Sequence, residues 1–254
     1  MAIELIGKTA PIPVEIRKTA DDGFRKIELY MREDFLDDRH VKFLADAKRE
    51  FGMKFYSIHT PHSEPDNFID VMGRTRDFAK KAGIPVIVVH SSHVNVFSKN
   101  VLDNLSGKMF PENGYMTPLP FLEKFLKRGL KICLDVGHLY VASVTSGRDY
   151  YEDLETIFKK YGKNIGHVHI ADVSEGFAGK KNLKETDCYD TNVGDGQIDF
   201  FKVMSILSKY YKGVAVVEVD ADRQLSDMEK LQKILSQFPR RRTVSKVSRR
   251  RRRA

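Results

Sequence analysis

The chain has 254 residues, of which 41% are hydrophobic and 31% are charged, proportions typical of a globular domain with a full core. Its longest apolar runs, such as Ile84–Val89, have the length of a strand, and none approaches the ~18 residues that a membrane span requires. Two cysteines, Cys133 and Cys188, do not make a disulfide framework, which indicates a reducing compartment. Met1–Gly7 is followed at once by Lys8, so we expect no secretory signal and predict a cytoplasmic protein without a membrane partner.

The net charge of +8 comes from the C-terminal end. Residues 240–254 hold eight Arg and one Lys and no acid, which leaves 34 basic against 35 acidic groups in the rest of the chain. Such a segment repels itself and lacks apolar periodicity, so we expect residues 1–239 to form one domain and residues 240–254 a disordered tail. The tail could bind nucleic acid or another polyanion, or it could be a solvated appendage without a dedicated role.

Short apolar runs alternate with amphipathic stretches along the whole chain. The eight expected strands are Ala2–Leu5, Lys26–Tyr30, Lys54–His59, Pro85–His90, Lys108–Glu112, Lys131–Asp135, Gly166–Ile170 and Val214–Val219. Several of them are almost continuously apolar, as parallel strands covered on both faces are. Eight strands with mostly helical connections predict the α/β class and a single (β/α)8 TIM barrel.

Between the strands, apolar residues recur at helical spacing. One stripe consists of Tyr151, Leu154, Phe158 and Tyr161, and another of Phe121, Leu122, Phe125 and Leu126. Thr117-Pro118 predicts the start of a helix that stops at Gly129. A capping box that begins at Ser226 predicts the start of the last helix, whereas the polar stretch Val94–Lys108 gives no clear helix.

In strand after strand, an apolar run leads to a side chain that can bind a metal. These residues are His59, His90, Glu112, Asp135, Glu218 and, within one strand, the pair His167 and His169. In a closed barrel the C-terminal strand ends meet at one mouth, where barrel enzymes build their active sites. A lone histidine at a strand end is usually structural, but partly buried imidazoles and carboxylates gathered in one place need a cation to join them. The sequence therefore predicts a ring of metal ligands at the barrel mouth.

The ligand types restrict the choice of metal. Imidazole and carboxylate without thiolate suit Zn²⁺, Mn²⁺, Fe²⁺ or Co²⁺, with Zn²⁺ and Mn²⁺ preferred here, and suit Ca²⁺ poorly. Cys133 is expected to alternate away from the mouth and to pack in the core, while Cys188 lies in a loop that could approach the site. Gly194-Asp195-Gly196 could bind a phosphate through backbone N–H groups, although a tight turn before a helix is the commoner explanation.

Seven short strings occur in the order seen in one superfamily. They are SIHTPH (57–62), VVHSSH (88–93), PENG (111–114), LDVGH (134–138), HVHIAD (167–172), GDGQIDF (194–200) and VVEV (216–219). Together they resemble the xylose-isomerase-like barrel superfamily, which includes sugar isomerases and epimerases and the apurinic endonuclease IV family. The resemblance extends from about residue 20 to about residue 220, and LDVGH and HVHIAD are its most specific parts.

Similarity to the epimerase branch implies one divalent metal held by four side chains, those of Glu112, Asp135, His169 and Glu218. In that branch the two glutamates also exchange the substrate proton, while the metal polarises the substrate oxygens. His138 would then bind a substrate oxygen, and His59 and His90 would line the pocket. A basic residue often follows the histidine of strand seven in these epimerases, but Asp172 and Glu175 occupy that neighbourhood here.

Similarity to the endonuclease IV family implies three zinc ions instead. Seven ligands would match, namely His59, His90, Glu112, Asp135, His138, His169 and Glu218. The remaining two ligands of that family form an Asp-x-His before the Gly-x-Gly, and this chain has Cys188 and Asp190 at those places. The third zinc site therefore departs from the family pattern, although Asp187 or Asp190 could partly replace it.

From these observations we predict a metal-dependent sugar or sugar-phosphate isomerase or epimerase with Glu112, Glu218 and His138 as catalytic residues. An apurinic/apyrimidinic endonuclease with two or three zinc ions is the alternative, and a barrel that keeps the metal pocket as a binding protein is the third. Four residues could bind a further metal or the substrate, namely His59, His90, His138 and Asp190. The expected partner is a small sugar or sugar phosphate, and a homo-oligomer is compatible with the sequence.

Overall fold

The computed structural model describes residues 3–90, 95–174, 191–219 and 222–238. Its eight strands are β1 (Glu4–Thr9), β2 (Lys26–Tyr30), β3 (Lys54–His59), β4 (Val86–Val89), β5 (Met109–Pro111), β6 (Ile132–Asp135), β7 (Ile165–Ile170) and β8 (Val214–Val217). The strands pair in parallel in the order β5-β4-β3-β2-β1-β8-β7-β6. A single parallel bridge between Glu112 and Cys133 links β5 to β6. The sheet is thus a nearly closed barrel, and the predicted single (β/α)8 TIM barrel is confirmed.

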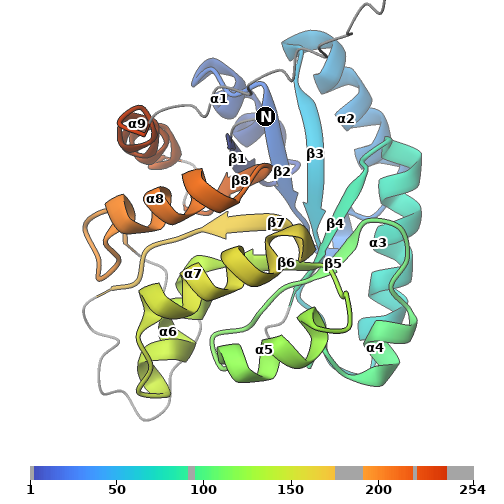
Figure 1. The fold of residues 1–254 in the computed structure, drawn as a ribbon. Coiled ribbons are helices and arrows are strands. Elements are labelled where there is room, and N and C mark those ends of the chain that lie inside the picture. The colour runs from blue at the N-terminus through green and yellow to red at the C-terminus, as the bar shows by residue number, and fades with distance from the viewer. Residues whose placement is uncertain (1–2, 91–94, 175–190, 220–221, 239–254) are drawn as a thin grey trace, which may run out of the picture.

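Helices lie around the outside of the strands (Figure 1). They are α1 (Pro13–Asp21), α2 (Asp38–Phe51), α3 (Phe68–Ala82), α4 (Lys99–Asp103), α5 (Leu119–Leu126), α6 (Val136–Thr145), α7 (Tyr150–Tyr161), α8 (Phe200–Tyr210) and α9 (Gln224–Leu235), with short 3-10 turns η1 (Glu33–Phe35) and η2 (Gly162–Asn164). Both apolar stripes predicted from the sequence lie on helices, since Leu154 and Phe158 of α7 and Leu122 and Leu126 of α5 are buried. None of the helices in the described ranges is long and apolar enough to cross a lipid bilayer.

Three predicted boundaries are wrong. The first strand is Glu4–Thr9 and not Ala2–Leu5, because Gly7 continues the strand where Phe24 and Gln224 leave no room for a side chain. The last helix begins before the predicted capping box, and the Ser226 hydroxyl donates backward to the Arg223 carbonyl instead of capping. The helix α5 starts at Leu119 with Pro118 as its N-cap, one residue later than Thr117-Pro118 predicted.

The core has two layers, as the alternation of side chains along a strand requires. Between strands and helices lies one large cluster that includes Leu29, Ile58, Leu134 and Val168. Inside the barrel lie two small clusters, one of Val86, Val88, Phe110 and Cys133 and one of Ile6, Val214 and Val216, with Tyr56 against both. The inner clusters fill the barrel interior below its C-terminal mouth. The polar side chains that follow them on the inner face of each strand therefore gather at the mouth.

Candidate metal centre

The ionisable residues of the site occupy the inward-facing positions at the strand ends. Four of them lie two residues beyond an inner-cluster residue, in the pairs Val88–His90, Phe110–Glu112, Cys133–Asp135 and Val216–Glu218. Residues two apart on a strand share a face, which explains why these side chains point into the same space. Cys133 is completely buried on this inner face, so it packs as predicted, but it lies beneath Asp135 and does not alternate away from it.

Two shifts of strand register bring the histidines to the inner face. The pairing of β2 with β3 shifts so that Glu28 faces Ser57 and Tyr30 faces His59, with Tyr56 as the extra residue. The pairing of β6 with β7 shifts in the same way at Gly166, so that Cys133 faces His167. An extra residue in one strand reverses its alternation beyond that point and re-aims the following side chains.

The structure brings together the four side chains that the epimerase resemblance implied as metal ligands. Glu112, Asp135, His169 and Glu218 each offer one ligand atom, and these atoms all lie within 4.8 Å of one another. The Nδ1 atom of His169 lies 2.6 Å from Oε1 of Glu112 and 2.7 Å from Oε2 of Glu218. Three of the four side chains are at most 1% exposed, whereas the Glu218 side chain is 26% exposed and is the one open to the mouth.

The donor set of this cluster fits a divalent metal. One carboxylate oxygen of Asp135 accepts the backbone N–H of His138 at 2.6 Å, while its Oδ2 atom has no hydrogen-bond partner among the described residues. Burial, together with the negative charges of the neighbouring Glu218 and Glu112, raises the pKa of Asp135 to about 6. Three carboxylates so close together in a buried site repel one another, and a divalent cation would add to the positive charge that Lys8 supplies beside Glu218.

Two of the further predicted residues contact one of these carboxylates. The Oε2 atom of Glu112 lies 3.3 Å from Nε2 of His59 and 3.0 Å from Nδ1 of His90. The rings of His59 and His90 lie side by side, with centroids 4.5 Å apart. Burial lowers the pKa of His59 to about 4, with Lys8 and His90 adding to the effect, so its imidazole is neutral and able to coordinate a metal at neutral pH.

The third predicted residue, His138, is held by the backbone. Its Nδ1 atom lies 2.7 Å from the carbonyl oxygen of Asn113, and its backbone N–H caps against Asp135, the N-cap of α6. The side chain is 4% exposed. His138 thus lies beside the candidate ligand Asp135, and the Asn113 carbonyl orients its ring.

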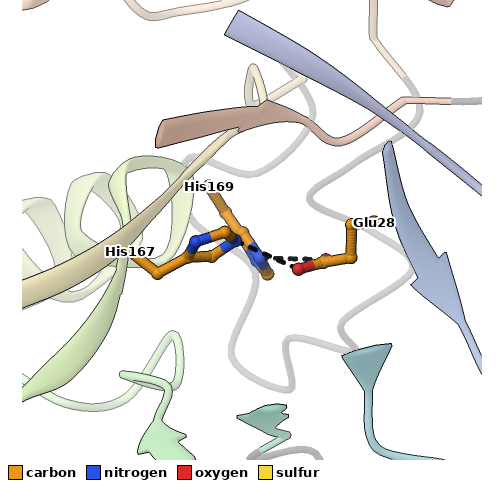
Figure 2. A group of neighbouring side chains, drawn as sticks. All are labelled: Glu28, His167 and His169. Atoms are coloured by element: carbon orange, nitrogen blue, oxygen red, sulfur yellow. Dashed lines mark hydrogen bonds and ion pairs between the residues drawn. The ribbon is translucent and has the colours of Figure 1, made fainter. Parts of the chain in front are cut away.

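Sequence reasoning missed two charged residues of the site, Lys8 and Glu28. Both are buried at inward-facing positions, and their Cα atoms are partners in the pairing of β1 with β2. The Lys8 ammonium forms an ion pair with Glu218 and lies 3.9 Å from Glu28. Glu28 in turn contacts both His167 and His169 (Figure 2). Lys8 was missed because the first strand was predicted to end at Leu5, and Glu28 because it lies within its strand and not at the end.

The phosphate-binding interpretation of Gly194-Asp195-Gly196 is wrong. The N–H groups of Gly194 and Gly196 donate to Oδ2 of Asp172 at 2.8 and 3.0 Å, so a protein carboxylate already occupies the place of an anion. Asp172 therefore fixes this turn, which agrees with the commoner structural explanation. Several other residues named from the sequence lie outside the described residues, namely Glu175, Asp187, Cys188, Asp190 and the Arg-rich tail 240–254.

Curated relatives of this chain are named inosose dehydratase. The protein from Glaesserella parasuis serovar 5 (strain SH0165) is 32% identical over 104 residues, which are 38% of this chain and 33% of the relative. The protein from Geobacillus thermodenitrificans (strain NG80-2) is 26% identical over 172 residues, which are 65% of this chain and 50% of the relative. The matches thus span half the length of these relatives or less.

Solved structures match the chain over nearly its whole length. A D-tagatose 3-epimerase-like protein has a TM-score of 0.66 and 19% identity, with 93% of this chain and 99% of that chain covered. The IOLI protein with a binding zinc atom has a TM-score of 0.66 and 15% identity over 94% of this chain and 99% of its own. Endonuclease IV from Thermus thermophilus has a TM-score of 0.66 and 14% identity over 94% of this chain and 100% of its own. At these identities the matches show a shared fold.

A match to a family model agrees with the fold. Residues 119–239 match the family described as xylose isomerase-like TIM barrel, and this stretch contains Asp135, His169 and Glu218. The fourth candidate ligand, Glu112, lies just before this stretch and directly after β5, where a bridge to Cys133 joins β5 to β6. Over this stretch the chain resembles the xylose isomerase-like TIM barrel family, as its sequence motifs predicted.

Proposed function

We propose that this chain is a metal-dependent enzyme that transfers a proton at the carbon next to the carbonyl of a sugar or a related polyhydroxy ketone. The observation that carries the proposal is the cluster of Glu112, Asp135, His169 and Glu218, in which two glutamates approach the same imidazole nitrogen. The zinc of the matched IOLI structure supports a divalent metal at such a site. Zn²⁺ and Mn²⁺ suit the mixed imidazole and carboxylate ligands.

The side chains divide the chemistry between them. A bound metal would polarise the substrate oxygens and so lower the pKa of the neighbouring C–H bond. Glu218 is the carboxylate open to the mouth and is placed to exchange the proton with substrate, with Glu112 as the second member of the acid/base pair. His138, at the edge of the cluster, would bind a substrate oxygen. The two glutamates would thus act both as metal ligands and as the groups that exchange the proton.

The reaction that follows proton removal can take two courses. Return of a proton to carbon gives isomerisation or epimerisation, whereas loss of a hydroxyl group from the adjacent carbon gives dehydration. The first course was predicted from the sequence, and the D-tagatose 3-epimerase-like structure supports it. The relatives named inosose dehydratase support the second. Both begin with the same proton transfer, so that step is the core of the proposal.

The test measures proton exchange and metal content in the same preparations. In D₂O, the chain loaded with Zn²⁺ or Mn²⁺ should exchange the proton next to the carbonyl of a ketose or an inosose, as followed by NMR. Glu218→Gln and Glu112→Gln should lower the exchange rate by roughly 10²- to 10⁴-fold, and Glu218→Ala and Glu112→Ala should lose the metal. Glu229→Gln, an exposed change on α9, is the matched control and should change neither. Undiminished metal content in both alanine variants would contradict the assignment of Glu112 and Glu218 as metal ligands.

An apurinic/apyrimidinic endonuclease is the second candidate function. The observation that favours it is the contact of both His59 and His90 with Glu112, since these side chains could hold a further metal ion beside the first. The matched endonuclease IV structure supports it at the level of the fold. Two or three zinc ions per chain, with cleavage of a duplex that contains an abasic site, would decide for this function. Removal of residues 239–254 should then weaken DNA binding in a salt-dependent way, whereas sugar chemistry should survive it.

Metal bound without proton exchange or DNA cleavage would instead favour a barrel that serves as a binding protein.

A further inference from the structure

Beneath the proposed metal ligands lies a second layer of buried polar groups centred on Glu28. This residue is completely buried within β2, and a carboxylate in such a place requires several partners. Its Oε2 atom accepts the Ser57 hydroxyl at 2.6 Å and lies 3.0 Å from Nε2 of His167. Its Oε1 atom lies 3.1 Å from Nε2 of His169 and 3.9 Å from the Lys8 ammonium. Glu28 therefore joins its two neighbouring strands to β7.

The contact with His169 reaches across the barrel. Ser57 and Lys8 are register partners of Glu28 on the adjacent strands β3 and β1, so local pairing accounts for those two contacts. His169 lies on β7, which is separated from β2 by β1 and β8 in the sheet. Figure 2 shows the rings of His167 and His169 both directed at the Glu28 carboxylate. The shift of register at Gly166 is what turns both rings inward.

The two nitrogens of the His169 ring face different layers of the site. Nε2 faces Glu28, while Nδ1 faces Glu112 and Glu218. An ionised carboxylate attracts N–H groups, so Glu28, whose Oε1 atom lies 3.1 Å from Nε2, would favour the tautomer with its hydrogen on Nε2 once an ion binds at Nδ1. That tautomer leaves a lone pair on Nδ1, the nitrogen among the proposed ligands. A carboxylate behind a ligating histidine fixes both the tautomer and the orientation of the ring in this way.

We infer that Glu28 is a positioning residue of the metal centre, which orients His169 so that Nδ1 is presented to the ion. This inference rests on the proposed function, because it assigns His169 as a ligand. Lys8 supports the arrangement from the other side, since its ammonium lies between the carboxylates of Glu28 and Glu218 and offsets the charge of both. Glu28 itself stays outside the ligand set, one imidazole away from the ion.

The test is the affinity for Co²⁺, which reports on the coordination through its visible absorption and needs no substrate. Glu28→Gln preserves the volume of the side chain and removes its charge. We expect it to weaken Co²⁺ binding by about 10- to 100-fold and to change the visible spectrum, because His169 is no longer fixed. His167→Gln is the matched control, since it removes the other imidazole beside Glu28 but keeps an N–H donor for that carboxylate and leaves the proposed ligands unchanged, and it should change the affinity by less than about threefold.

Each outcome of this test decides something. Unchanged Co²⁺ affinity and spectrum in Glu28→Gln, with one ion bound by the unaltered chain, would overturn the inference and leave the proposed function standing. Failure of the unaltered chain to bind Co²⁺ would overturn both. A second bound ion that both Glu28→Gln and His167→Gln abolish would make Glu28 a ligand and also overturn its positioning role. If Glu28→Gln does not fold, Ser57→Ala takes its place; it removes one hydrogen bond of Glu28 and should weaken Co²⁺ binding about 3- to 10-fold, and an unchanged affinity would overturn the inference.

Discussion

The side chain of Asn113 pairs with the backbone of Asp135 as a neighbouring strand would. Its Oδ1 atom accepts the N–H of Asp135 at 2.8 Å, and its Nδ2 group donates to the carbonyl of the same residue at 3.0 Å. This pair of bonds lies where β5 meets β6, the place at which a single bridge between Glu112 and Cys133 closes the barrel. The amide of Asn113 thus extends the closure and fixes the backbone of a proposed metal ligand.

Replacement of Asn113 should affect stability and metal binding together. Asn113→Ala leaves the buried N–H and C=O groups of Asp135 without these partners, which we expect to cost about 2–4 kcal/mol of unfolding free energy. Asp135 should also lose its fixed position, so Co²⁺ affinity should fall. Urea unfolding and Co²⁺ titration would measure the two effects. Asn100→Ala, at an exposed site on α4, should change stability by less than about 0.5 kcal/mol, and an equally small change at Asn113 would contradict the closure role.

A second prediction concerns Asp172, which holds the turn before α8. Its Oδ2 atom accepts two backbone N–H groups and its Oδ1 atom accepts two more, from Val173 at 2.8 Å and Ile198 at 3.1 Å. Asp172→Asn would place an NH₂ group against two of these donors, so we expect a loss of about 3 kcal/mol in urea unfolding. Asp195→Asn, exposed in the same turn, is the control and should be nearly neutral. Equal stabilities of the two variants would show that this turn is held by other contacts.

Much of the fold and of the site could be predicted because the signals are local. Apolar runs predicted seven of the eight strands to within about two residues at each end, and β2 and β3 without error. The residue that follows such a run lies at the barrel mouth for a geometric reason, so Glu112, Asp135 and Glu218 could be found without the structure. His169 lies within its strand, and only its motif HVHIAD singled it out.

The rest depends on contacts between distant parts of the chain. Gly7 looks like the end of a strand, yet β1 continues to Thr9 because Gln224, on the last helix, contacts the backbone of Lys8. The inward aim of Glu28 follows from its alternation with Ile27 and Leu29, which lie in the outer cluster, but its role follows only from its contact with His169 on β7. Strand alternation read from sequence also fails at a shift of register.

A third prediction concerns addition and removal of metal. A ligand that binds the folded chain at 100 times its dissociation constant stabilises it by about 2.7 kcal/mol, which for a chain of this size raises Tm by about 5–10 °C. Thermal unfolding with added Zn²⁺ or Mn²⁺ should show this shift, and a chelator should reverse it. Asp135→Asn should abolish the response, because it removes a charge from the cluster while its side-chain oxygen can still cap α6. Asp149→Asn, at the N-cap of α7, makes the same change away from the site and should keep the full shift.

The last prediction tests the shift of register at Gly166, the extra residue of β7. A Cβ atom at this position would lie 2.6 Å from Cζ of Phe110 and 2.7 Å from its Cε2, inside the barrel where the ring has no room to move. Gly166→Ala should therefore cost about 1–3 kcal/mol of unfolding free energy. Gly73→Ala, in the interior of α3 with nothing within 4 Å of the added atom, should instead stabilise the chain by about 0.5–1 kcal/mol.

A double variant separates the clash from any other effect of the new methyl group. Phe110→Leu removes part of the ring that Gly166→Ala would meet, so the combined variant should be more stable than the sum of the single changes implies, by about 1 kcal/mol or more. If the changes in unfolding free energy of the two single variants simply add, the ring of Phe110 is not the reason why position 166 requires glycine. In that case the shift of register would have to be maintained by the pairing of Cys133 with His167 itself. Since this shift turns His167 and His169 inward, Co²⁺ affinity measured on the same variants would show how closely the metal site depends on it.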